Sequence, residues 1–228
     1  DVIRTNPSDG VMTELKRTTK KNIGVRHALT LEQERKFLDF VRQDENACAW
    51  KNLYVTMFGT GCRIGEIIGL RWEDVDFEKR LISINHNITY YPRIENSYKN
   101  EFRVSLPKTD AGVRTVPMID KVYEALLAEK EYQDNGGMFC TSEIEGMSGF
   151  IFCNRYGNIH NPAAINRAIK RHVADCNAKE LVSAKRERRE PVILPRFSCH
   201  IARHTFCSRL CENDVNVKII QSIMGHKD

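Results

Sequence analysis

The chain has 228 residues, of which 41% are apolar and 29% charged, and this favours one globular domain, or one domain with a small extra segment. The net charge of +5 and the pI of about 8.8 are compatible with nucleic-acid binding but do not establish it. No apolar run approaches the ~20 residues that span a bilayer. Eight cysteines, without a Cys-x-x-Cys pair or a secretory leader, indicate free thiols in a reducing compartment. We therefore expect a cytoplasmic protein with no membrane partner.

The first segment, residues 1–28, is polar and basic with little apolar periodicity. We interpret it as a basic interdomain linker or arm that precedes a domain over residues 29–228. Basic side chains concentrate in a run at 16–21 and again at 185–190. Such runs are ordinarily solvated surface, and contact with DNA phosphates is the alternative. The candidates for DNA contact are Lys16, Arg17, Lys20, Lys21, Lys185 and Arg186.

Helices are predicted next along the chain. Thr30 and Gln33 form a capping-box pattern at the start of a helix over 30–43. A second helix over 49–62 ends in a glycine-rich turn, and a short helix over 63–70 follows. The apolar positions expected on the buried face of the first helix are Leu31, Phe37, Leu38 and Val41.

The middle of the chain has the character of β-strands. Residues 80–91 alternate and are rich in β-branched and aromatic side chains, which predicts a strand. Strands are also predicted over 101–108 and 113–118, with turn residues at 109–112 between them. These segments together predict a small antiparallel sheet.

The remaining part of the chain is mainly helical. Asn161 suits an N-cap, Pro162 suits the first turn of a helix, and Gly225 suits a helix end. The elements expected are a helix over 119–133, a short strand over 149–154, a helix over 160–177, a charged connection over 179–197, and helices over 200–213 and 216–226. The predicted fold class is α+β, a mainly helical domain with a small antiparallel β-sheet.

A metal centre and a nucleophilic hydrolase are both poorly supported. His200, His204, Cys207 and Cys211 lie along one stripe of a predicted helix. A straight helix of that length spans roughly 16 Å, so these side chains cannot all converge on one ion. A two-ligand half-site stays open, but no partner pair has suitable spacing. There is also no Gly-x-Ser-x-Gly elbow, so we predict neither a metal nor a cofactor.

Several basic side chains suit a phosphodiester. Arg63 follows a glycine turn at the start of a short helix, where free amides also gather. Arg203 lies three residues after His200 on one helix, and His226 follows a helix end. A guanidinium matches phosphate oxygens, and an imidazole exchanges protons near neutral pH. Scattered surface residues are the alternative that spacing alone leaves open.

Motifs in residues 60–77, 106–117 and 200–228 resemble those of the tyrosine recombinases, also called the phage-integrase family. The pattern is most similar to the integrases of conjugative transposons. The resemblance covers most of residues 30–228, and its motifs occur in the family order. It implies the tyrosine-recombinase catalytic-domain fold.

The resemblance assigns roles to individual residues. Lys108 matches the family's catalytic lysine, which lies in a β-hairpin, and Glu66 matches an acid that follows the first arginine. We interpret Glu66 as a supporting residue that orients Arg63. The positions that match the catalytic set are Arg63, Lys108, His200, Arg203 and His226.

The resemblance also implies a reaction. A tyrosine hydroxyl attacks a DNA phosphate and gives a 3′-phosphotyrosyl link with a free 5′-hydroxyl, which a second strand then reverses. Neither a metal nor a cofactor is needed. The implied partners are a double-stranded recombination site and further copies of the protein, as a homo-tetramer on DNA that integrates or excises a mobile element. An accessory DNA-bending protein is left open.

No tyrosine of this chain matches the family's nucleophile, which lies beyond the Gly-His pair at 225–226. We expect the domain to be truncated before that residue, and this chain alone to bind DNA without cutting it. Two rival interpretations stay open: a DNA-binding recombination factor without chemistry, and a type IB topoisomerase-like enzyme. The tyrosines, all interpreted as core, sheet or surface residues, are Tyr54, Tyr90, Tyr91, Tyr98, Tyr123, Tyr132 and Tyr156.

Overall fold

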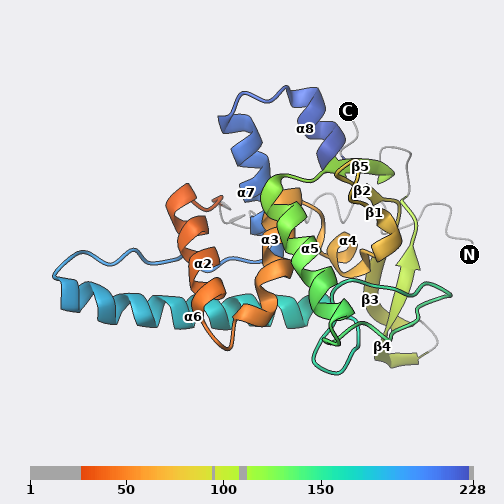
Figure 1. Ribbon diagram of the computed structural model, residues 1–228, viewed down its shortest axis with the longest axis horizontal. Coiled ribbons are helices and arrows are strands. Elements are labelled where there is room, and N and C mark those ends of the chain that lie inside the picture. Colours follow the sequence, from red (N-terminus) through yellow and green to blue (C-terminus); the bar gives the residue numbers. More distant parts are fainter. Residues whose placement is uncertain (1–26, 94–95, 108–111, 226–228) are drawn as a thin grey trace, which may run out of the picture.

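The computed structural model describes residues 27–93, 96–107 and 112–225. Helices dominate this part of the chain, and short antiparallel strands lie on one side of them (Figure 1). The predicted α+β class, a mainly helical domain with a small antiparallel component, is confirmed. The α-helices are α2 (Leu31–Gln43), α3 (Lys51–Thr60), α4 (Ile64–Gly69), α5 (Asp120–Asp134), α6 (Pro162–Glu187), α7 (Cys199–Glu212) and α8 (Val217–Met224), with 3₁₀ turns η1 (Cys48–Trp50) and η2 (Trp72–Asp74).

The start of α2 follows the predicted capping box. The Thr30 hydroxyl accepts from the Gln33 amide at 3.1 Å, and the Thr30 amide donates to Gln33 Oε1 at 3.0 Å. Phe37 and Val41 are buried, as predicted. Leu31 is 47% exposed, so its predicted burial is wrong. It lies in the first turn of α2.

Helix α3 lies at the centre of the helical part and contacts α2, α5 and α7. Its Tyr54 is fully buried, with its ring 5.3 Å from that of Phe37 on α2. Phe197, just before α7, packs edge-on against Phe37 with centroids 4.9 Å apart. Edge-to-face aromatic pairs add to the stabilisation from burial. This aromatic cluster fixes α3, and with it the turn that leads into α4.

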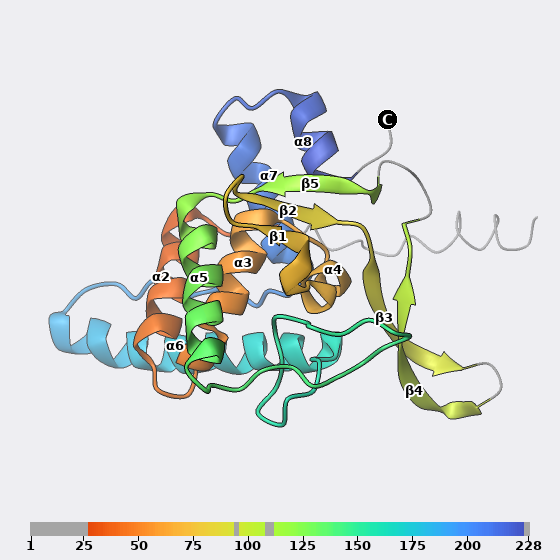
Figure 2. The ribbon, with the colours of Figure 1, turned by 45° about the vertical axis from the view of Figure 1, so that its right-hand side comes forward.

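The strands form two separate ladders. One has the order β1-β2-β5, with β2 antiparallel to both neighbours, and the other is the pair β3-β4 (Figure 2). The strand predicted over 80–91 is therefore divided between the two ladders at Asn85 and His86, whose side chains hydrogen-bond each other. The strands are β1 (Val75–Asp76), β2 (Leu81–Ile84), β3 (Asn87–Arg93), β4 (Asn96–Ser105) and β5 (Arg114–Pro117).

The strands on either side of Lys108 do not pair with each other in the described part of the chain. β4 pairs with β3, and β5 pairs with β2. The prediction of a hairpin at this point is therefore wrong. The cause is that the turn residues at 109–112 are a local signal, whereas strand pairing is set by burial of each strand against distant elements.

Helix α6 is longer than predicted. Asn161 is its N-cap, with the side chain accepting from the Ala164 amide at 2.7 Å, and Pro162 is its first residue, as expected. However, the helix continues to Glu187, so the first half of the predicted connection 179–197 is helical. The predicted strand over 149–154 is also wrong, because only isolated bridges occur there. No helix in residues that the structure describes has the length and apolar character needed to cross a bilayer.

Gly65→Ala is expected to lower stability, even though alanine favours helices over glycine by about 0.8–1 kcal/mol. A Cβ atom at residue 65 would lie 1.9 Å from Asn87 Oδ1 and 2.5 Å from the Ile88 carbonyl oxygen, where β3 crosses α4. Overpacking of this kind typically costs about 1–3 kcal/mol. Urea unfolding measures whether the free energy of unfolding falls or rises, and a gain in stability would contradict the close contact.

Candidate active site

Arg63 is placed by a tight turn between α3 and α4. Gly61 ends α3 with φ +61°, and a Cβ atom there would lie 2.2 Å from a ring carbon of Phe206. Only glycine combines this backbone conformation with this approach. Arg63 then serves as the N-cap of α4, and its side chain is 45% exposed. The turn thus holds an arginine at the start of a helix with part of its guanidinium open to solvent.

Glu66 is the buried centre of the site, with 6% of its surface exposed. Its Oε1 accepts from Arg63 Nη1 at 2.9 Å and from Arg114 Nη1 at 3.0 Å. Its Oε2 accepts from the Arg63 amide at 2.7 Å and from Arg114 Nη2 at 2.8 Å. Four donors occupy the lone-pair directions of the carboxylate. Glu66 is therefore arranged to hold arginines rather than to carry a proton.

The surroundings of Glu66 favour its ionised form. Burial raises the pKa, but the hydrogen bonds and the charge of Arg114, together with the Arg63 amide, outweigh burial and hold the pKa of Glu66 below its usual range. Charge-assisted, two-point contacts of this kind are the strong ones in proteins. Glu66 is therefore a carboxylate throughout the neutral range.

Arg203 on α7 is the second arginine of the site, and it is 5% exposed. Its Nη1 donates to the Gly61 carbonyl at 2.7 Å, and its Nη2 donates to the Met224 carbonyl at 2.5 Å. Burial, followed by the positive charge of Arg63, lowers the pKa of Arg203 to about 10. The guanidinium thus stays charged at neutral pH, close enough to Arg63 for the two to repel.

Arg114 is a site residue that the sequence reasoning missed. It lies on β5, where burial alternates so that Arg114 and Val116 face inward while Thr115 and Pro117 are exposed. A charged residue at an inward position of a strand must have a partner, because a lone buried charge is very costly. In the sequence, Arg114 and Val116 are two residues apart and so share one face of the strand predicted over 113–118, and this was the available signal.

A pocket of 330 Å³ lies beside these groups. A Cβ atom at Gly112 would lie 2.4 Å from Pro107 Cβ, so the two residues that flank 108–111 meet at the pocket rim. Lys108 itself, and His226, which follows Gly225, lie outside the described residues. The lining residues are Arg63, Glu66, His86, Asn87, Ser105, Leu106, Pro107, Gly112 and Gly225.

His200 lies one helical turn before Arg203 but in a different environment. Its side chain is exposed, and its Nε2 lies 2.9 Å from Nε2 of His204, with the rings edge-to-face at 4.4 Å. The structure therefore brings Arg63, Glu66 and Arg203 together and leaves His200 at the surface of the same helix.

The basic run near the end of α6 is separate from this cluster. Lys185 and Arg186 are exposed in its last turn, and this end of α6 projects away from α4 and α8 (Figures 1 and 2). The arm candidates Lys16, Arg17, Lys20 and Lys21 lie outside the described residues.

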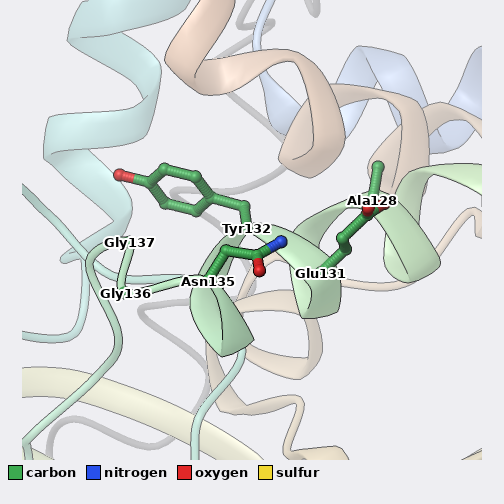
Figure 3. A pocket seen from close by; sticks show the side chains of 6 residues that line it. All are labelled: Ala128, Glu131, Tyr132, Asn135, Gly136 and Gly137. Atoms are coloured by element: carbon green, nitrogen blue, oxygen red, sulfur yellow. The ribbon is translucent and has the colours of Figure 1, made fainter.

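Another pocket, of 620 Å³, lies at the end of α5 (Figure 3). Tyr132 extends beside the Gly136–Gly137 turn, and Glu131 and Asn135 are exposed at its edge. No arginine or histidine lines it, so it offers nothing to hold a phosphate. In the described ranges, no group of three or more His, Cys, Asp or Glu side chains could hold a metal ion.

The arrangement suits an anion. Arg63, Arg114 and Arg203 lie around the single carboxylate of Glu66, so these four side chains carry more positive than negative charge. The exposed part of Arg63 opens on the pocket. A phosphate group matches this combination of charge and planar donors.

Comparison with known proteins gives a consistent match. The model of the phage integrase family matches residues 27–228. The transposase from transposon Tn916 of Enterococcus faecalis is 32% identical over 99% of this chain, and the chain spans 50% of the length of that relative. The prophage ps2 probable integrase of Lactococcus lactis is 32% identical over 74% of this chain and 39% of its own length.

Solved structures are similar over the same region. The Tn1549 transposon integrase in complex with transposon right end DNA superposes with a TM-score of 0.80 at 30% identity, over 99% of this chain and 65% of that one. The XerA recombinase superposes with a TM-score of 0.62 at 17% identity, over 89% of this chain and 57% of that one, which bears on the fold alone.

Glu66→Gln is expected to destabilise the protein at neutral pH, because Arg114 stays buried without its carboxylate partner. Breaking one member of a buried ion pair typically costs about 3–5 kcal/mol. The folded protein holds the pKa of Glu66 below its ordinary value of 4.5. The carboxylate therefore contributes its full stabilisation of the folded protein above pH 4.5. This stabilisation is lost as the pH falls through the lower pKa of the folded state.

Urea unfolding of both proteins across the acid range measures this difference in stability. The difference in the free energy of unfolding between the wild-type and the variant should become smaller as the pH falls. A gap that stays constant with pH would show that ionised Glu66 does not stabilise the site.

Proposed function

Because the chain belongs to the phage integrase family, we propose that it carries the catalytic domain of a site-specific DNA recombinase of the conjugative-transposon integrase type. The observation that carries this proposal is that Arg63 and Arg203, from motifs far apart in sequence, donate to the consecutive carbonyls of Gly225 and Met224. Arg63 also lines a pocket rimmed by both flanks of the segment that contains Lys108. The substrate is the phosphodiester backbone of a double-stranded recombination site. The Tn1549 integrase, which is similar in fold and sequence, was solved with transposon DNA.

The proposed reaction is a reversible transfer of a phosphoryl group. A tyrosine hydroxyl gives its proton to a histidine of the site as its oxygen bonds to phosphorus. The bond from phosphorus to the 5′-oxygen breaks, and that oxygen takes a proton from Lys108. A 5′-hydroxyl of a second strand later attacks the phosphotyrosine and releases the tyrosine. The bond energy is conserved in the intermediate, and the residues of the site need only bind charge and move protons.

Each site residue has a proposed role. Arg63 and Arg203 clamp the non-bridging oxygens, where charge increases in the transition state. Glu66 orients Arg63, as its four hydrogen bonds support. His200 and His226 contact the phosphate or exchange protons with the reacting oxygens. Lys108 protonates the leaving 5′-oxygen.

The proposed nucleophile is none of the tyrosines whose side chains the structure describes. Tyr54 is buried, its hydroxyl lies 3.1 Å from His172 Nδ1, and burial raises its pKa above the usual range. The others do not line the pocket at Arg63. They are Tyr90, Tyr91, Tyr123, Tyr132 and Tyr156.

Further contacts with DNA are proposed for Lys185, Arg186 and the arm that contains Lys16 and Lys20. Contacts to phosphates fix the position of a protein on DNA without reading its sequence. Three further statements stay predictions, and the family resemblance supports them. They are a homo-tetramer on DNA, a linker role for residues 1–28 and a cytoplasmic location.

Arg63→Ala or Arg203→Ala, in the full-length protein, should abolish most cleavage of recombination-site DNA. Loss of one preorganised donor typically costs about 10²–10³ in rate, while many other phosphate contacts maintain binding. Arg63→Lys should also fail, because an ammonium lacks the planar fork. Single-turnover cleavage and a gel-shift measurement of affinity separate the two effects.

The control is Arg42→Ala, which removes an exposed arginine on α2 that pairs with Asp39. It should leave cleavage unchanged. Normal cleavage by either alanine variant of the clamp would refute the clamp. Loss of binding in step with cleavage would show that the arginine holds DNA rather than the transition state. Absence of cleavage by the wild-type protein would support the rival interpretation, a DNA-binding module without chemistry.

Lys108→Ala should be slow on normal DNA and close to wild-type on DNA with sulfur in place of the 5′-bridging oxygen. A thiolate leaves without protonation, so a general acid is no longer required. Rates of covalent adduct formation on the two substrates give the comparison. If sulfur does not rescue the variant, Lys108 has a role other than proton transfer.

A further inference from the structure

Arg114 makes a two-point contact with Glu66 from the inward face of β5. Both side chains are buried, with 4% and 5% of their surfaces exposed, and the shorter of the two contacts is 2.8 Å. A guanidinium and a carboxylate aligned in this way fix each other's orientation as well as their distance. Both Nη atoms of Arg114 donate to the Glu66 carboxylate, and Arg114 does not line the pocket, so it influences a phosphate through Glu66.

The guanidinium of Arg114 is itself held from several sides. Its Nε donates to the Ile223 carbonyl at 2.6 Å, near the end of α8. Its Nη1 also lies 3.4 Å from the Gly112 carbonyl, in the connection just before β5. Together with the ladder between β2 and β5, these contacts leave the side chain one position.

Glu66 divides its contacts equally between two arginines. Arg114 supplies two donors and Arg63 supplies the other two. Without Arg114, a buried carboxylate would depend on Arg63 alone for compensation of its charge. Since an uncompensated buried charge is costly, Arg63 would be drawn toward Glu66 and away from an incoming anion.

We propose that Arg114 is a positioning residue that fixes Glu66 and thereby sets the position from which Arg63 reaches the phosphate. The inference rests on the proposed recombinase function and adds to it a residue that does not touch DNA. The order of contact runs from Arg114 to Glu66 to Arg63. Lysine at this position would retain the charge but not the two-point contact.

The test compares Arg114→Met, Glu66→Gln and the double variant in the full-length protein, using single-turnover cleavage at saturating recombination-site DNA. A misplacement of about 1 Å can cost 10²-fold in rate, so Arg114→Met should lose about that factor. Its affinity for DNA should change less than about threefold, because most phosphate contacts remain. Residues that act through one contact are not additive, so the double variant should be no slower than the slower single variant.

Arg209→Met is the matched control for a purely structural loss. Arg209 also links distant segments, since its Nη2 donates to the Leu29 carbonyl at 2.7 Å and its Nη1 pairs with Glu212. Its loss should lower the melting temperature and leave the cleavage rate of the folded protein unchanged. If Arg114→Met does not fold, Arg114→Lys replaces it. The expected result is the same, a slower cleavage rate with nearly unchanged affinity for DNA.

The outcomes separate this inference from the proposed function. Arg63→Ala in the same assay reports on the clamp itself. If Arg63→Ala is inactive while Arg114→Met cleaves at the wild-type rate, the role of Arg114 is overturned and the clamp stands. If the fold-loss of cleavage rate in the double variant equals the product of the two single fold-losses, Arg114 does not act on Arg63 through Glu66. Normal cleavage by Arg63→Ala would instead remove the proposed function.

Discussion

The site depends on the end of one short helix. Three guanidinium groups reach the last carbonyls of α8, which have no partner within the helix and form the negative end of its dipole. Each arginine comes from a different part of the chain, so the end of α8 holds α4, α7 and β5 close together. The donors are Arg114, Arg203 and Arg63, and the acceptors, in the same order, are the carbonyls of Ile223, Met224 and Gly225.

Such a cluster is expensive to bury, and the surrounding structure is arranged to compensate. Glu66 supplies the full negative charge, and the helix end and the Gly61 carbonyl supply partial charges. The thiol of Cys62 lies in the same environment, where burial and then the charge of Glu66 raise its pKa to about 11. It therefore stays protonated and adds no competing anion. A cluster satisfied in this way has one arrangement, which is what a phosphate clamp requires.

Local signals in the sequence predicted most of the helices. The capping box at Thr30 and the Asn161–Pro162 start both occur, because caps depend on neighbours three residues away. The charged end of α6 was missed because its buried face carries Glu180 in place of an apolar side chain, and Glu180 is held by Arg189 and Lys36. Strand pairing was missed for a different reason, since it depends on segments far apart in the chain. The same limit hid Arg114, whose partner lies 48 positions away.

Arg63 and Arg203 carry like charges, and the charge of Arg63 adds to burial in lowering the pKa of Arg203. Two such groups stay together only if something negative lies between or beside them. In the folded protein, the consecutive carbonyls of Met224 and Gly225 fill part of that role. These are partial charges, whereas a phosphate brings a full one, and more as a transition state develops. Arg203 is thus oriented by carbonyls, and Arg63 by a carbonyl and the Glu66 carboxylate, before any anion arrives. This is the preorganisation that makes binding strongest where the charge is greatest.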